Sequence, residues 1–561
     1  MRLTHLRIER FRGIPLLEMS LDPVTVVIGE NNHGKTSLFD VLGLCLARRS
    51  KPSDDRFREG DFFRRSADGT LDPIRIVLTF TEDLDAGSQD AAFDPAFVRA
   101  PDGSRLLRAE FVGEYGDRSV TRRFVDAEGV PISPQPDPSL FHLLRNLHPV
   151  LLLRFTHEGA ESGSVRAPER AGGSERRGRR SLEARVEKVY RDLTHTRGPL
   201  PTSEIARGLR AARRLFGRSD PSTGDDAPMH RMLAEILTDP GELGLGDTER
   251  PFRVRAGSGT HSVGILLVLG AMLEVRGDEA LPEGATPIIA IEEPAAHLHP
   301  ILLASTWDVI ESLRAQIVVT TNSSELLSSA PMRSLRRLVR RAHEIDVRSL
   351  GAETLGTADL RRLRYHIRAK RGGVLFARCW LLVEGESEFW LMTHLAHVLG
   401  RDLDAEGVRC VEFAQCGVTP LVKLANDLGI EWHLLADGDE SGTAYAREAR
   451  HHLDALPPER RVTQLSERDV ERCLWEHGFE DVYREAAGTS PRGDHRRAPQ
   501  SPHQIIAKAV RKKSKPHLAL LVAEQCAVRG PASIPPPLRG VIETSVALAR
   551  SSVSAGGTVV R

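Results

Sequence analysis

Residues 29–37 read GENNHGKTS, and this stretch decides the fold of the N-terminal part of the chain. It fits the phosphate-loop pattern GxxxxGK followed by Ser or Thr, with the apolar strand sequence VTVVI before it and the helix-forming SLFDVLGLCLA after it. The glycines let backbone N–H groups surround phosphate oxygens, Lys35 reaches the β- and γ-phosphates, and Thr36 offers its hydroxyl to Mg²⁺. The sequence therefore predicts a site for ATP with Mg²⁺. The residues expected to bind the nucleotide are Gly29, Asn31, Asn32, Gly34, Lys35, Thr36 and Ser37.

A second apolar run, PIIAIEEP (287–294), delivers Glu292 and Glu293 at the expected carboxyl end of a strand. Given the phosphate loop upstream, Glu292 is predicted to hold Mg²⁺, directly or through water, and Glu293 to orient or deprotonate the attacking water. The alternative is that the two acidic residues only cap the next helix. His297 and His299, which follow in AAHLHP, are expected to be packing or loop residues.

Between these motifs, RAGSGTHSVGILLVLGAML (255–273) places Gly257, Ser258 and Gly259 before an apolar helix. Because a helix N-terminus attracts anions, Ser258 and Gly259 are predicted to contribute to the ATP site. A tight turn without a ligand is the alternative.

Two further strand ends carry carboxylates. CWLLVEGESE delivers Glu384 and, four residues later, Glu388, while LLADGDESG delivers Asp437 and Asp439. Carboxylates at neighbouring strand ends repel one another unless cations neutralise them, which indicates Mg²⁺ or Mn²⁺. Two ions would clamp the attacking and leaving oxygens of a phosphodiester. Each pair taken alone is equally consistent with a helix cap or a solvated face.

Short apolar runs recur along the chain, and they predict an α/β protein with mainly parallel sheets and crossover helices. The runs are VTVVIGE, IRIVLTF, PIIAIEEP, QIVVTTN, CWLLVEGE and EWHLLADGD. An Arg-rich segment with Gly, Ser and Pro interruptions, from about 158 to 250, separates these runs. Its arginines are consistent with solvated helix faces, a dimer interface or a DNA-facing surface. We therefore predict an ATPase N-terminal part (1–157), a dimerising helical insert (158–250), an ATPase C-terminal part (251–370) and a second α/β domain (371–561).

The composition sets limits on partners and compartment. The 561 residues include 77 Lys and Arg and 77 Asp and Glu, so any DNA binding must depend on local basic patches. Six cysteines without a CxxC pair or zinc-like spacing indicate buried thiols in a reducing, cytoplasmic compartment. No apolar run approaches the roughly 18 residues of a membrane span.

The order of phosphate loop, Gly/Ser signature, acidic strand, AAHLHP and QIVVTTNS resembles the ABC-type ATPases of the SMC and RecF group, as does the opening RLTHLRIERFRGI. In that group the signature helix of one protomer completes the ATP site of the other, which implies a homodimer linked by ATP. Asn322 stands where these ATPases usually have a switch histidine, and no Q-loop glutamine is evident. Slow turnover is therefore expected.

A strand-end glutamate with glycine, followed later by DxD, resembles the Toprim domain of topoisomerases, primases and some nucleases. An ABC-type ATPase followed by a Toprim domain resembles the OLD (overcoming lysogenization defect) endonucleases, including the nuclease subunit of Gabija-type phage defence. ERDVERCLWEHGF and KKSKPHLAL look closest to the second class of that family. The resemblance implies that Lys515 stabilises charge on the scissile phosphate. The metal-site residues that it implies are Glu384, Glu388, Asp437, Asp439, Ser441 and Glu471.

Without the resemblance, two of these assignments are weak. Glu471 reads as a charged residue on an amphipathic helix face. Lys515 belongs to a basic run with Lys512 and Lys513 that is consistent with a solvated face or with contacts to a DNA backbone.

The predicted reaction is hydrolysis by metal-activated water. None of the five tyrosines lies in a recognisable winged-helix nucleophile context, and there is no primase zinc motif. The main hypothesis is an ATP-regulated, Mg²⁺- or Mn²⁺-dependent DNA endonuclease in phage defence or DNA repair. The alternative is a RecF-like repair ATPase whose Toprim domain binds DNA without cutting it. A third interpretation is one component of a defence system whose partner helicase senses the invader.

Overall fold

The structure is a computed structural model, and the chain divides into two compact units. The first comprises Met1–Val339 and His343–Val347, and the second comprises Arg340–Ala342 and Arg348–Arg561. The residues described are 1–46, 56–63, 72–82, 88–116, 120–132, 135–154, 285–295, 307, 315–369, 372–453, 457–489 and 500–554. The predicted helical insert (158–250) and the Gly/Ser signature with Gly257, Ser258 and Gly259 lie outside these residues, as do His297 and His299.

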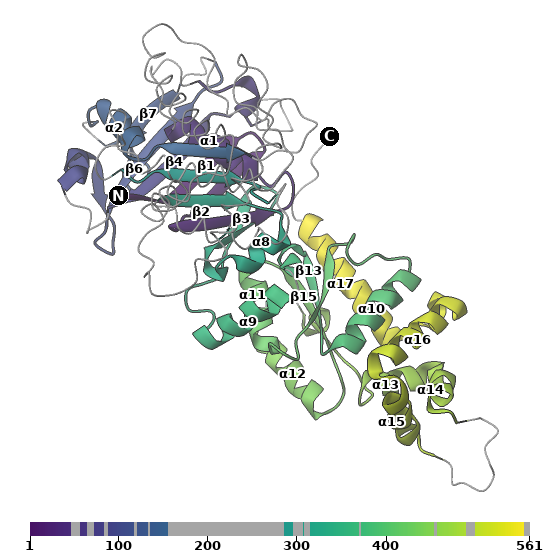
Figure 1. The fold of residues 1–561 in the computed structure, drawn as a ribbon. Coiled ribbons are helices and arrows are strands. Elements are labelled where there is room, and N and C mark those ends of the chain that lie inside the picture. The colour runs from purple at the N-terminus through teal and green to yellow at the C-terminus, as the bar shows by residue number, and fades with distance from the viewer. Residues whose placement is uncertain are drawn as a thin grey trace, which may run out of the picture. The chain divides into compact units, whose positions relative to one another are not determined.

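A 12-stranded mixed sheet forms the centre of the first unit (Figure 1). Its order is β5-β6-β4-β1-β2-β12-β11-β3-β10-β9-β8, and β7 pairs with β6. The strands are β1 (Arg2–Phe11), β2 (Ile14–Ser20), β3 (Val24–Gly29), β4 (Ile74–Thr81), β5 (Phe97–Arg99), β6 (Arg105–Gly113), β7 (Val120–Phe124), β8 (Val150–Arg154), β9 (Ile288–Glu292), β10 (Gln316–Thr320), β11 (Leu335–Arg340) and β12 (Ile345–Arg348). The α-helices described in this unit are α1 (Lys35–Leu46), α2 (Ser139–Leu147) and α8 (Ser324–Ser329).

One half of this sheet is antiparallel, which corrects the prediction of mainly parallel sheets for this unit. Strands β1 and β2 pair antiparallel because only Arg12 and Gly13 connect them, and a parallel pair needs a crossover of a dozen or more residues. The run IRIVLTF forms most of β4, which pairs antiparallel with both β1 and β6. The α/β class is confirmed, and the parallel part of the sheet is the part that carries the phosphate loop.

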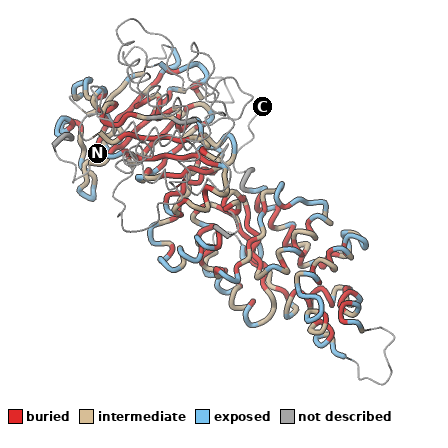
Figure 2. Tube along the Cα trace, viewed as in Figure 1, coloured by how far each residue is buried: buried red, intermediate tan, exposed pale blue. Residues whose placement is uncertain are grey.

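The parallel strands β3, β10, β9 and β8 lie side by side, so their carboxyl ends share one edge of the sheet. Helix α1 packs on these strands through the fully buried Leu38, Phe39 and Leu42. Burying one such side chain contributes roughly 1.5–3 kcal/mol. Figure 2 shows that the strands of this sheet are buried along most of their length. A packed core therefore holds the phosphate loop and the acidic strand end at one edge.

The second unit contains a four-stranded parallel sheet in the order β14-β13-β15-β16. Helices α11 and α12 cover one face, and α10 and α17 cover the other (Figure 1). The strands are β13 (Cys379–Val383), β14 (Val408–Glu412), β15 (Glu431–Ala436) and β16 (Val462–Gln464). The helices are α9 (Thr357–Ala369), α10 (Glu386–Val398), α11 (Val418–Leu428), α12 (Glu440–Arg450), α13 (Val470–Leu474), α14 (Glu480–Ala487), α15 (Pro502–Lys513), α16 (Lys515–Arg529) and α17 (Pro536–Ser554). The parallel sheet predicted for this part of the chain is confirmed.

The cysteines and the helices bear on two sequence predictions. All six cysteines are free thiols, and five of them are buried, as expected from their apolar surroundings. Among the described helices, none combines the length and the apolar composition that crossing a bilayer requires.

Candidate functional site

The phosphate loop joins β3 to α1, as the motif predicts. Lys35 is buried, and its Nζ donates hydrogen bonds to the carbonyl oxygens of Gly29 at 2.5 Å and Glu30 at 3.3 Å. Burial lowers the pKa of Lys35, although Glu293 and Glu292 nearby act in the opposite direction. Gly34 has a φ of +91°, and a Cβ there would lie 3.0 Å from Ile14 Cδ1, so a larger residue is strained at this position. The loop thus holds an ammonium group where phosphates are expected.

The acidic strand end lies beside this loop. Thr36 Oγ1 donates a hydrogen bond to the Glu292 carboxylate, although the two residues are 256 positions apart. Strand β10 separates β9 from β3 in the sheet, and the backbone N–H of Asn322 after β10 donates to Glu293 Oε2 at 2.9 Å. The hydroxyl and carboxylate predicted to hold Mg²⁺ are therefore in contact. Asn322, at the position of the expected switch histidine, holds Glu293 through its backbone.

The remaining loop residues have less contact with the fold. Asn31 and Asn32 are exposed, and Asn32 adopts a φ of +67°, a conformation that asparagine tolerates. Ser37 lies half-buried in the first turn of α1. Their contact with a nucleotide remains a prediction from the motif.

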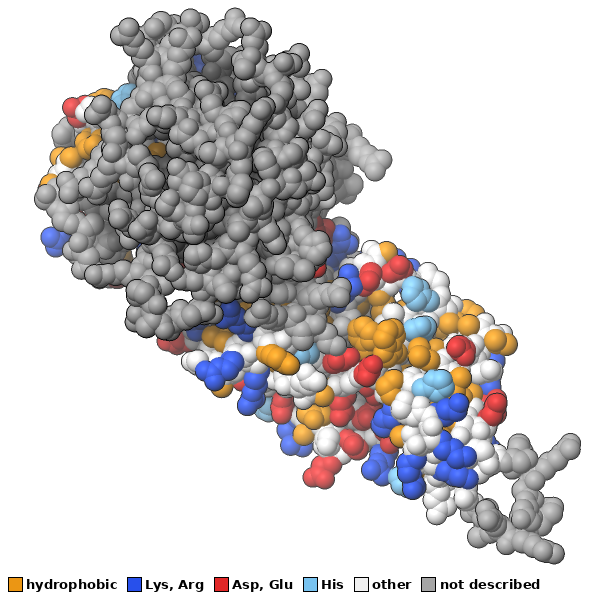
Figure 3. Space-filling view, in the orientation of Figure 1, with side chains coloured by type: hydrophobic (Ala, Val, Ile, Leu, Met, Phe, Trp, Pro, Cys, Tyr) orange, Lys and Arg blue, Asp and Glu red, His pale blue; other side chains and the backbone are white. Residues whose placement is uncertain are grey.

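In the second unit, four predicted carboxylates lie at the ends of two neighbouring strands. Glu384 follows β13 and Asp437 follows β15, which pairs with β13. Glu388 lies in the first turn of α10, where its Oε2 accepts the backbone N–H of Gly385 at 3.1 Å. Asp439 caps α12 by accepting the backbone N–H of Gly442 at 2.7 Å. Acidic side chains gather on the face of this unit shown in Figure 3.

Two glycines of LLADGDESG are required by close backbone approach. A Cβ at Gly442 would lie 2.1 Å from the carbonyl oxygen of Asp437. A Cβ at Gly438 would lie 2.4 Å from the carbonyl oxygen of Glu467, which accepts the Gly438 N–H at 3.1 Å. The strand end can therefore turn sharply into α12 and present Asp437 and Asp439 together.

The cluster is electrostatically unfavourable without cations. Burial, and then Glu388, Glu384 and Glu471, raise the pKa of Asp437 to about 8. Burial is also the main cause that raises the pKa of Glu388 to about 7. Burial and Asp439 raise the pKa of Glu384. Carboxylate oxygens whose negative charge is disfavoured are the donor type that Mg²⁺ and Mn²⁺ prefer, so the chemistry of these residues fits a divalent ion.

Lys515 and Glu471 join this cluster from separate helices. Lys515 Nζ lies 3.0 Å from Glu471 Oε1 and 3.1 Å from Oε2, with 48% of the lysine side chain and 7% of the glutamate side chain exposed. Glu471 raises the pKa of Lys515 against the effect of burial, and Glu388 acts in the same direction. The lysine is therefore half-exposed and paired with a buried carboxylate of the cluster.

Sequence reasoning missed two residues beside this cluster. Asp469 caps α13 by accepting the N–H of Arg472 at 2.8 Å, and its charge acts on both Asp437 and Lys515. Its position two residues before Glu471, at a helix start, was the available signal. Tyr445 of α12 packs edge-on against Phe413 and lies near Glu384 and Asp439.

The other residues predicted here lie at the edge. Ser441 is exposed in the first turn of α12. Lys512 donates a hydrogen bond to the carbonyl oxygen of Ala487 at 2.9 Å, and Lys513 is exposed at the end of α15.

The pKa values predict how the stability of the metal-free protein depends on pH. The folded chain keeps a proton on Asp437 up to about pH 8, whereas the unfolded chain releases it near 3.8. The resulting stability is fully present below the lower pKa and is lost as pH rises through the higher one. In EDTA, the melting temperature of the second unit should therefore fall between about pH 4 and pH 8. Calorimetry should show that Mg²⁺ cancels the fall; a flat profile in EDTA would contradict the prediction.

Comparison with known proteins gives consistent matches along the chain. Residues 1–373 match the family described as protein of unknown function (DUF2813), and residues 375–439 match the overcoming lysogenization defect protein-like Toprim domain. The chain is 33% identical to the uncharacterized protein YbjD of Escherichia coli K12, over 98% of this chain and 99% of that protein. It is 25% identical to the OLD nuclease of Thermus scotoductus, over 78% of this chain and 82% of that protein.

Two solved structures are also similar in part. The C-terminal region of the Burkholderia pseudomallei OLD protein is 15% identical, with a TM-score of 0.26, over 32% of this chain and 99% of that one. The SMC head domain from Thermotoga maritima is 12% identical, with a TM-score of 0.30, over 63% of this chain and 100% of that one.

A phosphate-loop unit followed by a Toprim sheet with clustered carboxylates defines the class of ATPase–Toprim proteins. Proteins with these two domains generally use ATP and divalent metal ions. The chain belongs to the DUF2813 family and is an OLD-family ATPase–Toprim protein. The resemblance seen in its motifs is thereby confirmed.

Proposed function

We propose that this protein is a DNA endonuclease that depends on Mg²⁺ or Mn²⁺ and is regulated by ATP. One observation carries the proposal: half-buried carboxylates at neighbouring Toprim strand ends lie close enough to raise the pKa of Asp437, and a half-exposed lysine is paired with Glu471 beside them. The OLD nuclease of Thermus scotoductus, to which the chain is similar, supports the same activity.

Five carboxylates would hold the ions: Glu384, Glu388, Asp437, Asp439 and Glu471. When bound, divalent ions supply a water of lowered pKa and neutralise charge on the phosphodiester. Lys515 would contact a non-bridging oxygen of the scissile phosphate, because its half-exposed ammonium group lies beside the carboxylates. Ser441, which is exposed, would approach the site from α12.

A cavity lined in part by Glu384 could accommodate part of the DNA substrate. It measures about 340 Å³, and its lining includes Glu384, Phe389, Trp390 and Gln415. Because Trp390 is partly exposed and aromatic side chains stack on bases, this cavity suits a nucleotide next to the scissile bond.

In the first unit, Lys35, Thr36 and Glu292 would bind ATP with Mg²⁺, and Glu293 would orient the attacking water. Ser258 and Gly259 would complete the site of a second protomer, so we infer an ATP-linked homodimer formed with the 158–250 insert. We place the activity in phage defence or DNA repair, with a partner helicase as the candidate sensor in a defence system.

Supercoiled plasmid tests the proposal directly. The purified protein is incubated with Mg²⁺, Mn²⁺ or EDTA, each with and without ATP, beside an Asp437→Ala/Asp439→Ala double variant. Metal-dependent nicking should occur with the wild type and be lost in the double variant, and the ATP lanes should show the sign of the control. ATP hydrolysis without scission in any lane would refute the nuclease and favour a repair ATPase.

A further inference from the structure

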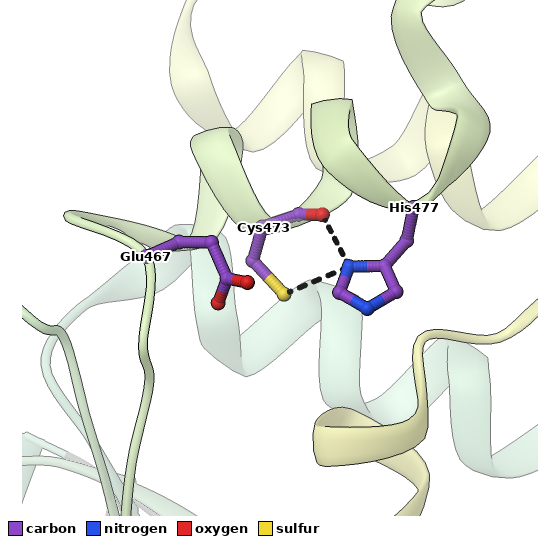
Figure 4. Close-up of side chains that lie close together, drawn as sticks. All are labelled: Glu467, Cys473 and His477. Carbon is purple, nitrogen blue, oxygen red and sulfur yellow. Dashed lines mark hydrogen bonds between the residues drawn. The ribbon is translucent and has the colours of Figure 1, made fainter.

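Around Cys473, which follows Glu471 by two residues, a second group of side chains has the donor types of a different metal. Glu467 follows β16, Cys473 lies in α13, and His477 lies one helical turn later (Figure 4). One ligand atom of each lies within 4.8 Å of the other two. The three residues come from a segment of eleven residues, but their spacing matches no common zinc motif.

The distance between the sulfur and the nitrogen matches a tetrahedral ion. Cys473 Sγ lies 3.7 Å from His477 Nδ1. Zinc bonds of about 2.3 Å to sulfur and 2.0–2.1 Å to nitrogen place two tetrahedral ligands about 3.6 Å apart. The side chains therefore need little movement to share one ion.

Two further observations favour a ligand here. Glu467 Oε2 is buried and accepts no hydrogen bond of normal geometry. Cys473 is fully buried, and its thiol lies close enough to the Glu467 carboxylate to interact with it. A thiol beside a carboxylate and an imidazole offers the donor types that a thiophilic ion binds, and the ion would take the place of the thiol proton.

A hydrogen bond competes for the same nitrogen. His477 Nδ1 donates to the carbonyl oxygen of Cys473 at 2.8 Å, which caps α13 where the helix is kinked. The ion must replace this proton at Nδ1. The purely structural interpretation is that His477 serves only as this cap, and it predicts no metal binding.

We propose that Glu467, Cys473 and His477 bind a zinc-class divalent ion, with water as the fourth ligand. A thiolate with imidazole selects Zn²⁺ over Mg²⁺, whereas the all-carboxylate cluster selects Mg²⁺ or Mn²⁺. The two sites therefore take different ions from the same solution.

The ion would position the nuclease carboxylates. The carbonyl oxygen of Glu467 accepts the N–H of Gly438, which lies between Asp437 and Asp439. Cys473 follows Glu471 by two residues on α13. An ion that joins Glu467 to α13 thus ties both sides of the cluster together, and the role is one of positioning.

Zinc binding by the full-length protein tests the proposal. The protein is stripped with EDTA and transferred into excess Mg²⁺, so that the carboxylate cluster is occupied, and Zn²⁺ is then titrated against a chromophoric indicator. Co²⁺ is added in parallel, because a thiolate-to-cobalt charge-transfer band reports a sulfur ligand. The variants are Cys473→Ser and His477→Asn, and the control is Cys526→Ser, another buried cysteine of the same unit.

One equivalent of Zn²⁺ and a charge-transfer band are expected for the wild type and for Cys526→Ser. Both variants should bind Zn²⁺ at least about 10-fold more weakly, and Cys473→Ser should lose the band. His477→Asn keeps the test decisive if Cys473→Ser fails to fold, because His477 is not in the core. The proposal is overturned if folded wild type binds no Zn²⁺, or if Cys473→Ser keeps the affinity and the band.

Discussion

Replacement of Lys515 by methionine is expected to slow strand scission by about 100- to 1000-fold and to leave ATP hydrolysis unchanged. The ammonium group lies 3.0 Å from Glu471 at the edge of the carboxylate cluster, where it can stabilise charge that develops on the phosphate. Removal of one such electrostatic contact typically lowers a rate by about 10²–10³-fold. Methionine keeps the length and most of the apolar stem. The measurement is the initial rate of plasmid nicking at saturating Mg²⁺.

The control is Lys513→Met, because Lys513 is exposed in the same basic run. If both lysines only follow the DNA backbone, both variants should weaken binding similarly and lower its salt dependence by about one counterion each. A specific role for Lys515 requires loss of scission with little loss of DNA binding. Equal effects in the two variants would contradict the role assigned to Lys515.

The stability of Lys515→Met separates catalysis from folding. Without the lysine, Glu471 remains buried among like charges, so the metal-free variant should melt at a lower temperature than the wild type. Saturating Mg²⁺ should restore the melting temperature, since the ions neutralise the same carboxylates. Loss of scission that persists in the restored protein would then be chemical in origin.

Much of both sites could be predicted because the chemistry lies in short motifs at strand ends. The phosphate loop determines its own strand, turn and helix, and LLADGDESG contains the glycines that its turn requires. The order of the strands explains a contact between distant segments. Thr36 hydrogen-bonds to Glu292 because β3, β10 and β9 are parallel neighbours whose carboxyl ends share one edge of the sheet. These features depend on local sequence and on one rule of sheet geometry.

Other features depend on tertiary packing that no local pattern reveals. The antiparallel half of the first sheet arises because β4 pairs with β1 and β6. An apolar run such as IRIVLTF is compatible with both parallel and antiparallel pairing, so the sequence alone does not reveal this arrangement. Strand β16 has only three residues, which is too short to be recognised in the sequence. The sequence therefore did not indicate that Asp469, which follows this strand, lies beside the cluster. The sequence indicates Cys473 only as a buried thiol, because Glu467 reaches it from the loop after β16 and His477 from the kinked segment after α13.

The second large effect is expected from Lys35→Ala in the first unit. The Lys35 Nζ is held over the loop by the carbonyl oxygens of Gly29 and Glu30, so its charge is already placed for the β- and γ-phosphates. Its loss removes a charge-assisted contact in a buried setting, and ATP affinity should fall by about 100-fold or more, close to 3 kcal/mol. Binding of a fluorescent ATP analogue measures the loss, and binding within about threefold of wild type would contradict the assignment.

Glu293→Gln is the matched variant, since it should keep ATP binding and abolish hydrolysis. Glutamine retains the size of the side chain and an oxygen for the Asn322 N–H, but it cannot accept a proton from water. Lys35→Ala therefore represents the protein without bound nucleotide, and Glu293→Gln represents the protein with bound ATP that is not hydrolysed. If ATP licenses scission, Glu293→Gln should nick plasmid and Lys35→Ala should not; if ATP restrains scission, the order is reversed. Equal nicking by both variants would show that ATP does not regulate the Toprim site.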